Sequence, residues 1–203
     1  MKNTLLAVAL AGATFAALPA LSHAQDPANG SGGFFINGNV GQSNLSKGPY
    51  DDSDTAFGGN VGYRWAINPN VALGIEGGYT DLGKFNTKDP FVGVGPSRAT
   101  VKGWTAGVNG HFNLTPEWYL SGRAGLFRAD VQGLAPVTVG VQPLTTTYAY
   151  VDDTSTKYYA GAGFGYDFSN RFSVGLNYDY FKADKDNLKL DPNLVSVSAE
   201  YRF

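Results

Sequence analysis

The sequence predicts an all-β fold: an eight-stranded antiparallel up-and-down transmembrane β-barrel. Three observations lead to this prediction. Eight segments alternate apolar and polar residues, as strands with one buried face do. The connections between them alternate between tight turns and long polar stretches, the asymmetry typical of barrels that cross an outer membrane. The charged residues of the strands fall on the face opposite the apolar side chains.

The first 24 residues have the pattern of a signal peptide. Lys2 gives a positive start, residues 5–18 form a nearly unbroken apolar run, and Ser22-His23-Ala24 offers the small residues that a signal peptidase accepts. We expect cleavage after Ala24, which leaves a periplasmic amino-terminal segment at 25–32 and an outer-membrane β-barrel domain at 33–203. An uncleaved membrane anchor is the less favoured alternative, because the run is short for crossing a bilayer.

Composition narrows the classes of protein further. The 203 residues include no cysteine, which excludes both a lipoprotein and a disulfide framework. Without the signal peptide the chain keeps 15 − 1 = 14 basic residues against 17 acidic ones, and this balance gives no indication of nucleic-acid binding. Glycine, tyrosine and phenylalanine are abundant, as is typical of strands and turns.

The first four strands are predicted by apolar residues that recur on one face of each segment. In order, with the apolar residues of each, they are 34–43 (Phe34, Ile36, Val40), 56–65 (Phe57, Val61, Tyr63, Trp65), 71–80 (Val71, Leu73, Ile75, Tyr79) and 100–112 (Trp104, Ala106, Val108, Phe112).

The last four strands follow the same rule. They are 118–127 (Trp118, Leu120, Ala124, Leu126), 158–168 (Tyr158, Phe164, Tyr166), 172–181 (Val174, Leu176, Tyr178, Tyr180) and 195–203 (Val195, Val197, Ala199, Tyr201, Phe203). Three connections are tight, at 66–70, 113–117 and 169–171. Four are long and polar, at about 44–55, 81–99, 128–157 and 182–192. The long connections are therefore expected to face outward.

Three arginines and four carboxylates fall on the polar faces of the strands. They are Arg64, Glu76, Arg123, Asp167, Asp179, Glu200 and Arg202. In a soluble barrel this face would meet water, whereas in a membrane barrel it lines the lumen, where charges must be paired to offset their desolvation. An eight-stranded lumen is narrow enough for side chains to fill it. We therefore predict an internal charge network that plugs a polar interior.

Aromatic residues gather near both ends of the predicted strands. Rings favour the two membrane interfaces, although general enrichment of aromatics in strands is the alternative. The end with the tight turns carries Trp65, Trp118, Phe168, Phe172 and Phe203, and the other end carries Tyr79, Phe85, Tyr158 and Tyr180.

Three stretches carry a family resemblance: Gly125-Leu126-Phe127-Arg128-Ala129-Asp130, the run 174–184, and Glu200-Tyr201-Arg202-Phe203. With them the chain resembles the small outer-membrane β-barrels of Gram-negative bacteria, of the OmpA transmembrane-domain and OmpX kind. The resemblance implies a location in the outer membrane among its lipid and lipopolysaccharide. It also implies that the barrel-assembly machinery reads Tyr201 and Phe203 as an assembly signal. A periplasmic peptidoglycan-binding domain is not expected.

Catalytic and metal-binding patterns are weak. His111 is the one histidine left after the expected cleavage, without a paired nucleophile, so we interpret it as a hydrogen-bonding residue of the lumen rather than as a catalytic base. The acidic stretches at 51–54, 152–153 and 184–186 lack the full pattern of a calcium loop. We therefore predict no enzyme activity, no metal and no cofactor.

The most favoured function is structural, or an interaction at the cell surface through four outward loops. Two runs with high β propensity, 137–141 and 145–150, could extend the fifth and sixth strands beyond the membrane. A raised strand edge could capture an extracellular protein or host ligand. Two alternatives remain open, a narrow porin-like pore for ions or small solutes and a lipid-modifying enzyme.

Overall fold

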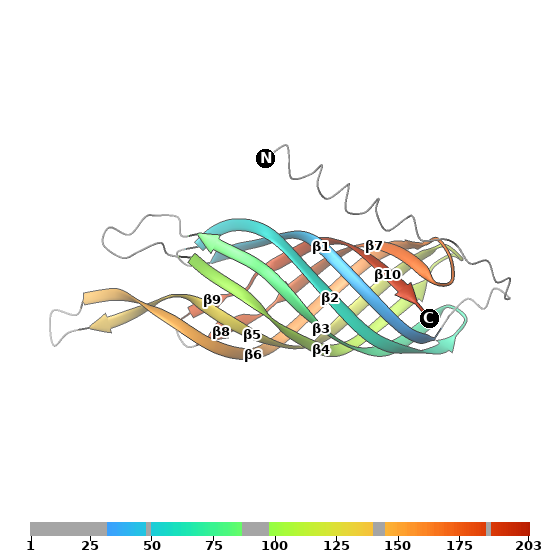
Figure 1. Cartoon of the computed structure of the whole chain (residues 1–203), viewed down its shortest axis with the longest axis horizontal. Helices are drawn as coiled ribbons and strands as arrows, with labels where there is room; N and C mark the ends of the chain where they lie inside the picture. Colours follow the sequence, from blue (N-terminus) through green and yellow to red (C-terminus); the bar gives the residue numbers. More distant parts are fainter. Residues whose placement is uncertain (1–31, 48–49, 87–97, 140–144, 186–187) are drawn as a thin grey trace, which may run out of the picture.

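In a computed structural model, antiparallel strands close into a barrel (Figure 1). The structure describes residues 32–47, 50–86, 98–139, 145–185 and 188–203. Within these ranges no helix is long and apolar enough to cross a membrane. The predicted signal peptide lies outside the described residues, and so does the segment after it except for Gly32.

Eight strands form the wall of the barrel, as predicted. They are β1 (Gly33–Lys47), β2 (Tyr50–Asn68), β3 (Val71–Asn86), β4 (Arg98–Asn113), β5 (Trp118–Val139), β6 (Thr145–Asp167), β7 (Phe172–Phe181) and β10 (Asn193–Arg202). Each pairs antiparallel with its neighbours along the chain, and β10 closes the ring against β1. The up-and-down topology and the fold class are confirmed.

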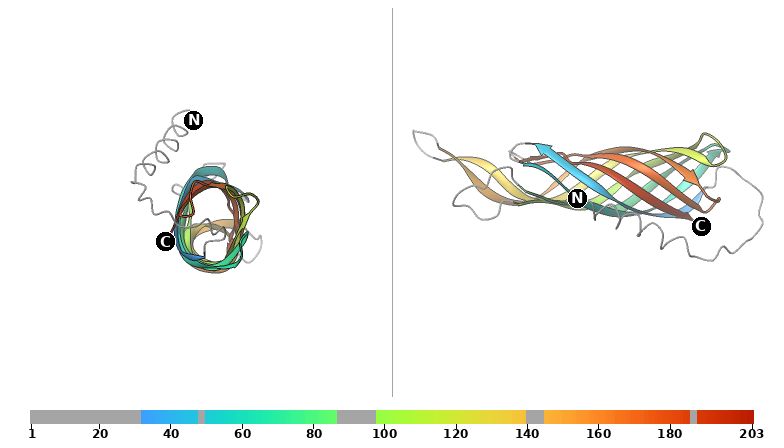
Figure 2. Two further views of the ribbon diagram at one scale, coloured as in Figure 1. Left: turned by 90° about the vertical axis from the view of Figure 1, so that its right-hand side faces the viewer. Right: turned by 90° about the horizontal axis from the view of Figure 1, so that it is seen from above.

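The closing pair runs from Phe35 opposite Arg202 to Asn44 opposite Asn193. Just beyond it, the backbone N–H of Phe203 donates a hydrogen bond to the carbonyl oxygen of Phe34 at 3.0 Å. The ring is therefore continuous, as the view along the barrel shows (Figure 2). Closure pairs the edge strands with each other and removes the free edges that an open sheet would expose.

The two ends of the barrel differ. At one end, here called the turn end, tight turns join β2 to β3, β4 to β5 and β6 to β7. At the opposite end β5 and β6 continue well beyond the other strands (Figure 1). We call this second end the ribbon end. The three tight turns are where the sequence predicts them.

An outer apolar band surrounds the barrel. Within it the outward side chains of every wall strand are apolar and exposed, whereas the inward ones are mostly polar and buried. One outward member from each strand illustrates the band: Ile36, Val61, Ile75, Val108, Leu120, Phe164, Leu176 and Val197. The residues predicted to face outward do so, which confirms the predicted assignment of faces. An apolar band of this kind is what a barrel presents to the hydrocarbon of a membrane.

The lumen at the ribbon end is apolar, whereas the alternation in the sequence predicts a polar one. We call this packed group the upper apolar core; its buried members are Leu45, Ala56, Leu82, Phe85, Ala99, Val101, Phe127, Ala129, Val131, Tyr159, Phe181, Ala183 and Leu194. The prediction of a wholly polar interior is therefore wrong for this part of the barrel. Phe85 was expected in an outer aromatic belt, and this prediction is also wrong.

The lumen becomes apolar because the apolar side chains change from the outer face of each strand to its inner face. On β5, Leu126 points outward and is 60% exposed, whereas the next residue, Phe127, points inward and is fully buried. Adjacent apolar residues mark the same reversal at 56–57, 158–159, 180–181 and 194–195. Below it the barrel is built like a membrane barrel, and above it like a soluble barrel with a hydrophobic core.

The strands accordingly run further than predicted. The first predicted loop, at 44–55, is largely strand, because β1 continues to Lys47 and β2 begins at Tyr50. A bulge between Asp81 and Lys84, where Gly83 has a φ of 89°, turns both Leu82 and Phe85 inward. Two short strands, β8 (Ala183–Lys185) and β9 (Leu188–Leu190), form a hairpin within the predicted loop 182–192.

Candidate functional site

The polar half of the lumen begins with a bidentate ion pair between β2 and β10. Arg64 donates from Nη1 to Oε1 of Glu200 at 2.5 Å and from Nη2 to Oε2 at 2.9 Å. Its Nε donates to Oδ1 of Asn109 at 2.5 Å, and its guanidinium lies 4.1 Å from the ring centre of Phe35. Two parallel hydrogen bonds and an aromatic partner hold this buried guanidinium in one orientation.

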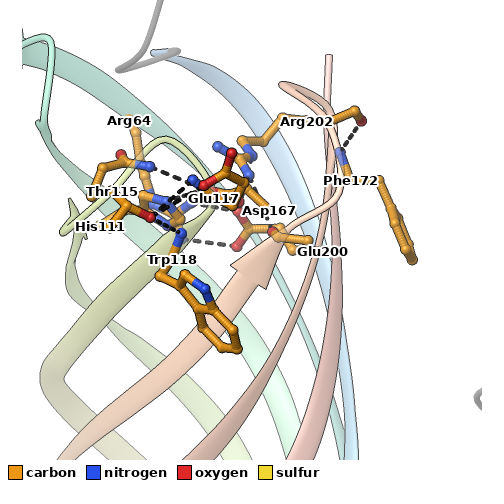
Figure 3. A network of polar contacts seen from close by, with 12 residues as sticks. Arg64, His111, Thr115, Glu117, Trp118, Asp167, Phe172, Glu200 and Arg202 are labelled. Atoms are coloured by element: carbon orange, nitrogen blue, oxygen red, sulfur yellow. Dashed lines mark hydrogen bonds and ion pairs between the residues drawn. The ribbon is translucent and has the colours of Figure 1, made fainter.

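A second cluster gathers around Asp167 at the turn end (Figure 3). Arg202 donates from Nη2 to one carboxylate oxygen of Asp167. His111 Nε2 and Asn113 Nδ2 each lie 3.1 Å from the other oxygen. Arg202 Nε also lies 3.5 Å from Oε1 of Glu200. The two clusters therefore form one connected network of charges.

A third pair lies higher in the lumen, between β5 and β7. Arg123 donates from Nε and Nη2 to the two carboxylate oxygens of Asp179 at 2.6 and 2.5 Å, and Asp179 is fully buried. Glu76 accepts a hydrogen bond of 2.8 Å from the hydroxyl of Tyr159. All seven residues of the predicted charge network thus point into the lumen, six of them in ion pairs and Glu76 bound to a tyrosine of the upper apolar core.

The lumen leaves little space around these pairs. A cavity of about 40 Å³ lies among Arg64, Glu76, Asn109, Arg123 and Asp179. Opening it would separate buried ion pairs, and leaving a buried charge without its partner costs about 3–5 kcal/mol. Buried ion pairs therefore cross this half of the lumen.

The ribbon end is closed independently. The upper apolar core fills the lumen above the polar network with side chains that have almost no exposed surface. The hairpin β8–β9 lies at the mouth, where β9 contacts both β5 and β1, on opposite sides of the ring. A solute moving through the barrel would have to displace both an ionic and an apolar barrier.

The β5–β6 ribbon is the most prominent feature outside the barrel (Figure 2). β5 and β6 have 22 and 23 residues, whereas β7 and β10 have 10 each. Their mutual pairing continues to Val139 opposite Thr145. The pairing of β4 with β5 ends at Gln132, and the pairing of β7 with β6 ends at Tyr159. The predicted extension of these two strands is confirmed.

Acidic residues of the ribbon end bind backbone groups. Asp54 Oδ2 accepts a hydrogen bond of 2.8 Å from the backbone N–H of Lys84. Asp52 Oδ2 accepts one of 2.9 Å from the N–H of Asn86 and a second of 2.7 Å from its side chain. The backbone hydrogen bond from Asn86 lowers the pKa of Asp52 below its ordinary value. These carboxylates thus fasten the end of β3 to β2.

His111 is held in place by a neighbouring ring and a carboxylate. Its ring stacks on Tyr119 with centroids 4.1 Å apart, and its Nε2 faces Asp167. Ser121 lies opposite His111 in the β4–β5 ladder, but within the described ranges no hydrogen bond joins the two. Nor do these ranges contain a group of three or more histidines and carboxylates that could hold a metal ion.

The remaining predicted residues lie on the outside of the barrel. Tyr201 and Phe203 face outward, their rings in an edge-to-face contact at 5.1 Å, and Phe203 is 75% exposed. Trp65, Trp118 and Phe168 are exposed near the turn end, and Phe172 there is partly buried. Toward the ribbon end Tyr158 is exposed, and Tyr79 and Tyr180 are partly buried. The inward residues that the sequence pattern did not predict are those of the upper apolar core.

Comparisons with known proteins agree with this architecture. A family model described as the outer membrane protein beta-barrel domain matches residues 8–203. One similar solved structure is that of Ail, the attachment invasion locus protein of Yersinia pestis, in complex with the heparin analogue sucrose octasulfate. The two structures have a TM-score of 0.55 and the two sequences are 17% identical. The match covers 85% of this chain and 99% of the Ail chain. OprG from Pseudomonas aeruginosa is similar with a TM-score of 0.52 and 10% identity, over 88% and 100%. No curated protein matched the sequence.

Because the sequence identities are low, the likeness to these solved structures shows a common fold only. The family of the chain is shown by the family model. That model covers nearly the whole chain, and the outer apolar band and closed ring are those of a barrel in an outer membrane. In such barrels the short turns are periplasmic and the longer connections extracellular, so the turn end is the periplasmic end and the ribbon end the extracellular one. The chain therefore belongs to the family of outer membrane proteins built on this β-barrel domain.

Proposed function

We propose that the protein acts at the cell surface by binding an extended segment of another protein along the edges of the β5–β6 ribbon, with the barrel as its membrane anchor. The observation that carries the proposal is the length of the ribbon. In 133–139 of β5 and 145–152 of β6, the described residues include no third strand paired with either edge. Unpaired backbone groups on such edges can add a strand from a partner.

The charge of the ribbon end favours a protein ligand over a sulfated glycan. The solved complex of Ail contains a heparin analogue, and binding such a polyanion depends on an excess of basic side chains. In this chain the segments 81–99 and 128–157 together carry five basic and five acidic residues. Backbone hydrogen bonding along a strand edge does not depend on net charge, so it fits this balance better.

Shortening the ribbon should abolish binding and leave the barrel intact. We would remove residues 134–150 and join Gly133 to Val151 through an Asn-Gly turn, which suits a tight hairpin. Cells of a Gram-negative strain that display the shortened protein should adhere to cultured epithelial cells no better than cells without it. Folding would be checked by heat modifiability on gels.

A matched control keeps the ribbon and replaces residues 87–97 with a short Gly-Ser linker. This variant also removes extracellular chain, but it leaves the edges of β5 and β6 unchanged. Its adhesion should equal that of the unmodified protein. Full adhesion by the ribbon-shortened variant would refute strand capture, whether or not the control adheres.

Two finer proposals concern the membrane. We infer that the outer apolar band contacts outer-membrane lipid and, on the extracellular side, lipopolysaccharide. We also infer that Tyr201 and Phe203 serve as the assembly signal for the barrel-assembly machinery. Their outward, exposed rings at the carboxyl end of the chain support the second proposal, because a machinery that receives the last strand can reach them.

We propose further that the protein is not an enzyme. The one histidine of the barrel is buried in the periplasmic half, away from the outer leaflet that a lipid A-modifying site would need to reach. Substituting His111→Ala should therefore leave the mass spectrum of lipid A identical to that of cells with the unmodified protein. A change in acyl-chain number that also appears on deletion of the gene would identify an enzyme instead.

A further inference from the structure

The outer part of the β5–β6 ribbon carries no charged residue. The stretch 133–151 contains no aspartate, glutamate, lysine, arginine or histidine. The nearest charged residues are Asp130 on β5 and Asp152 on β6. Proteins usually protect a free strand edge against pairing with their own copies by placing charged residues or proline on it. The sequence of the ribbon therefore lacks the first of these two protections.

Proline distinguishes the two edges of the ribbon. Pro136 on β5 lies opposite Tyr148 on β6. Because proline has no N–H to donate, a strand pair accommodates it where its backbone nitrogen points away from the paired strand. The nitrogen of Pro136 therefore points to the free edge of β5, which loses a donor at this position. Residues 145–152 of β6 include no proline, so the free edge of β6 keeps all its donors.

The backbone groups on the free edge of β6 follow from the same pair. In an antiparallel ladder, two opposite residues that do not bond each other both direct their backbone groups away from the pair. On β6 these are Tyr148 and every second residue, such as Thr146, because the β5–β6 register has no shift. Lower on β6, the carbonyl oxygen of Tyr158 accepts a hydrogen bond of 3.0 Å from the N–H of Lys182, on the side away from β5. This contact agrees with the alternation, so the free edge offers a regular row of donors and acceptors.

We propose that this free edge of β6 pairs with the same edge of a second copy of the chain on a facing cell. The proposal rests on the proposed function, since it names one partner that the ribbon captures. An identical strand would bring each charge close to its like, which destabilises a strand pair, and 145–151 brings none. Both strands offer the same row of backbone groups, so a two-fold symmetric ladder forms between them.

Strand direction determines where the second copy comes from. The ribbon continues along the length of the barrel, and β6 runs from the outer end of the ribbon toward the membrane (Figure 1). Two copies in one membrane hold their β6 strands in the same direction, whereas copies on facing cells hold them in opposite directions. Antiparallel pairing is the more stable of the two. Within one membrane β6 would instead meet the β5 edge of a neighbour antiparallel, and Pro136 interrupts that edge.

Mixing of fluorescent cells tests the proposal. Cells of a Gram-negative strain with short lipopolysaccharide would display the protein in two populations of different colour, and a third population would carry no protein. Flow cytometry counts doublets that contain two colours. Doublets between the two displaying populations should be several-fold more frequent than doublets between displaying and empty cells.

Two proline variants separate the edges. Thr146→Pro removes a donor from the free edge of β6 and should reduce the doublets several-fold. Thr138→Pro is the matched control, because Thr138 lies opposite Thr146 and, two residues after Pro136, directs its N–H to the free edge of β5. This control should form doublets as often as the unmodified protein does. Should Thr146→Pro fail to fold on a heat-modifiability gel, Tyr150→Pro removes another donor of the same edge.

Four results would overturn the proposal. They are an absence of doublets, equal numbers of doublets with empty cells, full doublet formation by a folded variant of the β6 edge, and an equal loss in Thr138→Pro. Adhesion of the same cells to epithelial cells separates this proposal from the proposed function. Normal adhesion without doublets would overturn self-pairing alone, whereas doublets without adhesion would support self-pairing and contradict capture of another protein.

Discussion

Replacing Phe127 with alanine is expected to destabilise the folded barrel by about 3–5 kcal/mol. The ring is fully buried in the upper apolar core, in edge-to-face contact with Phe181 at 5.0 Å. Its removal would leave a cavity between strands that are fixed by backbone hydrogen bonds and cannot collapse onto it. Urea unfolding of the refolded protein in lipid vesicles, followed by tryptophan fluorescence, measures the loss.

The control for this prediction is the next residue on the same strand. Arg128 points outward and is exposed, so Arg128→Ala should change the free energy of unfolding by no more than about 0.5 kcal/mol. Similar losses at both positions, or a larger loss at Arg128, would contradict the reversal of the apolar face above the outer apolar band.

The second large effect is expected in the membrane-spanning part of the barrel. There the outward face of a strand, and not the inward one, is sensitive to an added charge. Leu176 faces outward and is 61% exposed, and Leu176→Arg should cost about 2–4 kcal/mol because it places a charge in hydrocarbon. Asn177 faces inward and lines the cavity in the lumen, so Asn177→Gln, which keeps the amide group and adds no charge, should cost less. The measurement is the folded fraction in vesicles, read from heat modifiability. Equal losses at the two positions would show that the register is wrong.

The sequence predicted the membrane-spanning part of the barrel well, because one rule holds throughout it. Apolar residues face out and polar residues face in, so the alternation in 172–181 was enough to place Leu176 and Asn177 on the correct faces. The tight turns bound the strands at one end, and the matching family model is of the kind that the sequence resembles.

The extracellular part could not be predicted in this way. A search for a constant alternation stops where the apolar face changes, and the predicted strands accordingly ended at Phe127 and Phe181 and began at Tyr158 and Val195. The alternation therefore predicts loops beyond these points. Adjacent apolar residues such as Leu126-Phe127 are the signal that could have located the reversal.

The sequence also could not predict which residues of the charge network pair with each other. Arg64 and Glu200 are 136 positions apart, and only the closure of β10 on β1 together with the stagger of the strands brings them together. A count of three arginines and four carboxylates suggested pairing without indicating which residues pair. The role of the β8–β9 hairpin at the mouth depends in the same way on contacts with distant strands.

The central claim is that the barrel is a closed anchor whose activity lies outside the lumen. Current recordings across planar lipid bilayers that contain the purified, folded protein test it most directly. We predict a baseline without conductance steps, because the ion pairs and the upper apolar core both close the lumen, and the same baseline for Glu76→Gln. Stable conductance steps whose ion preference changes in Glu76→Gln would contradict the claim and identify a pore.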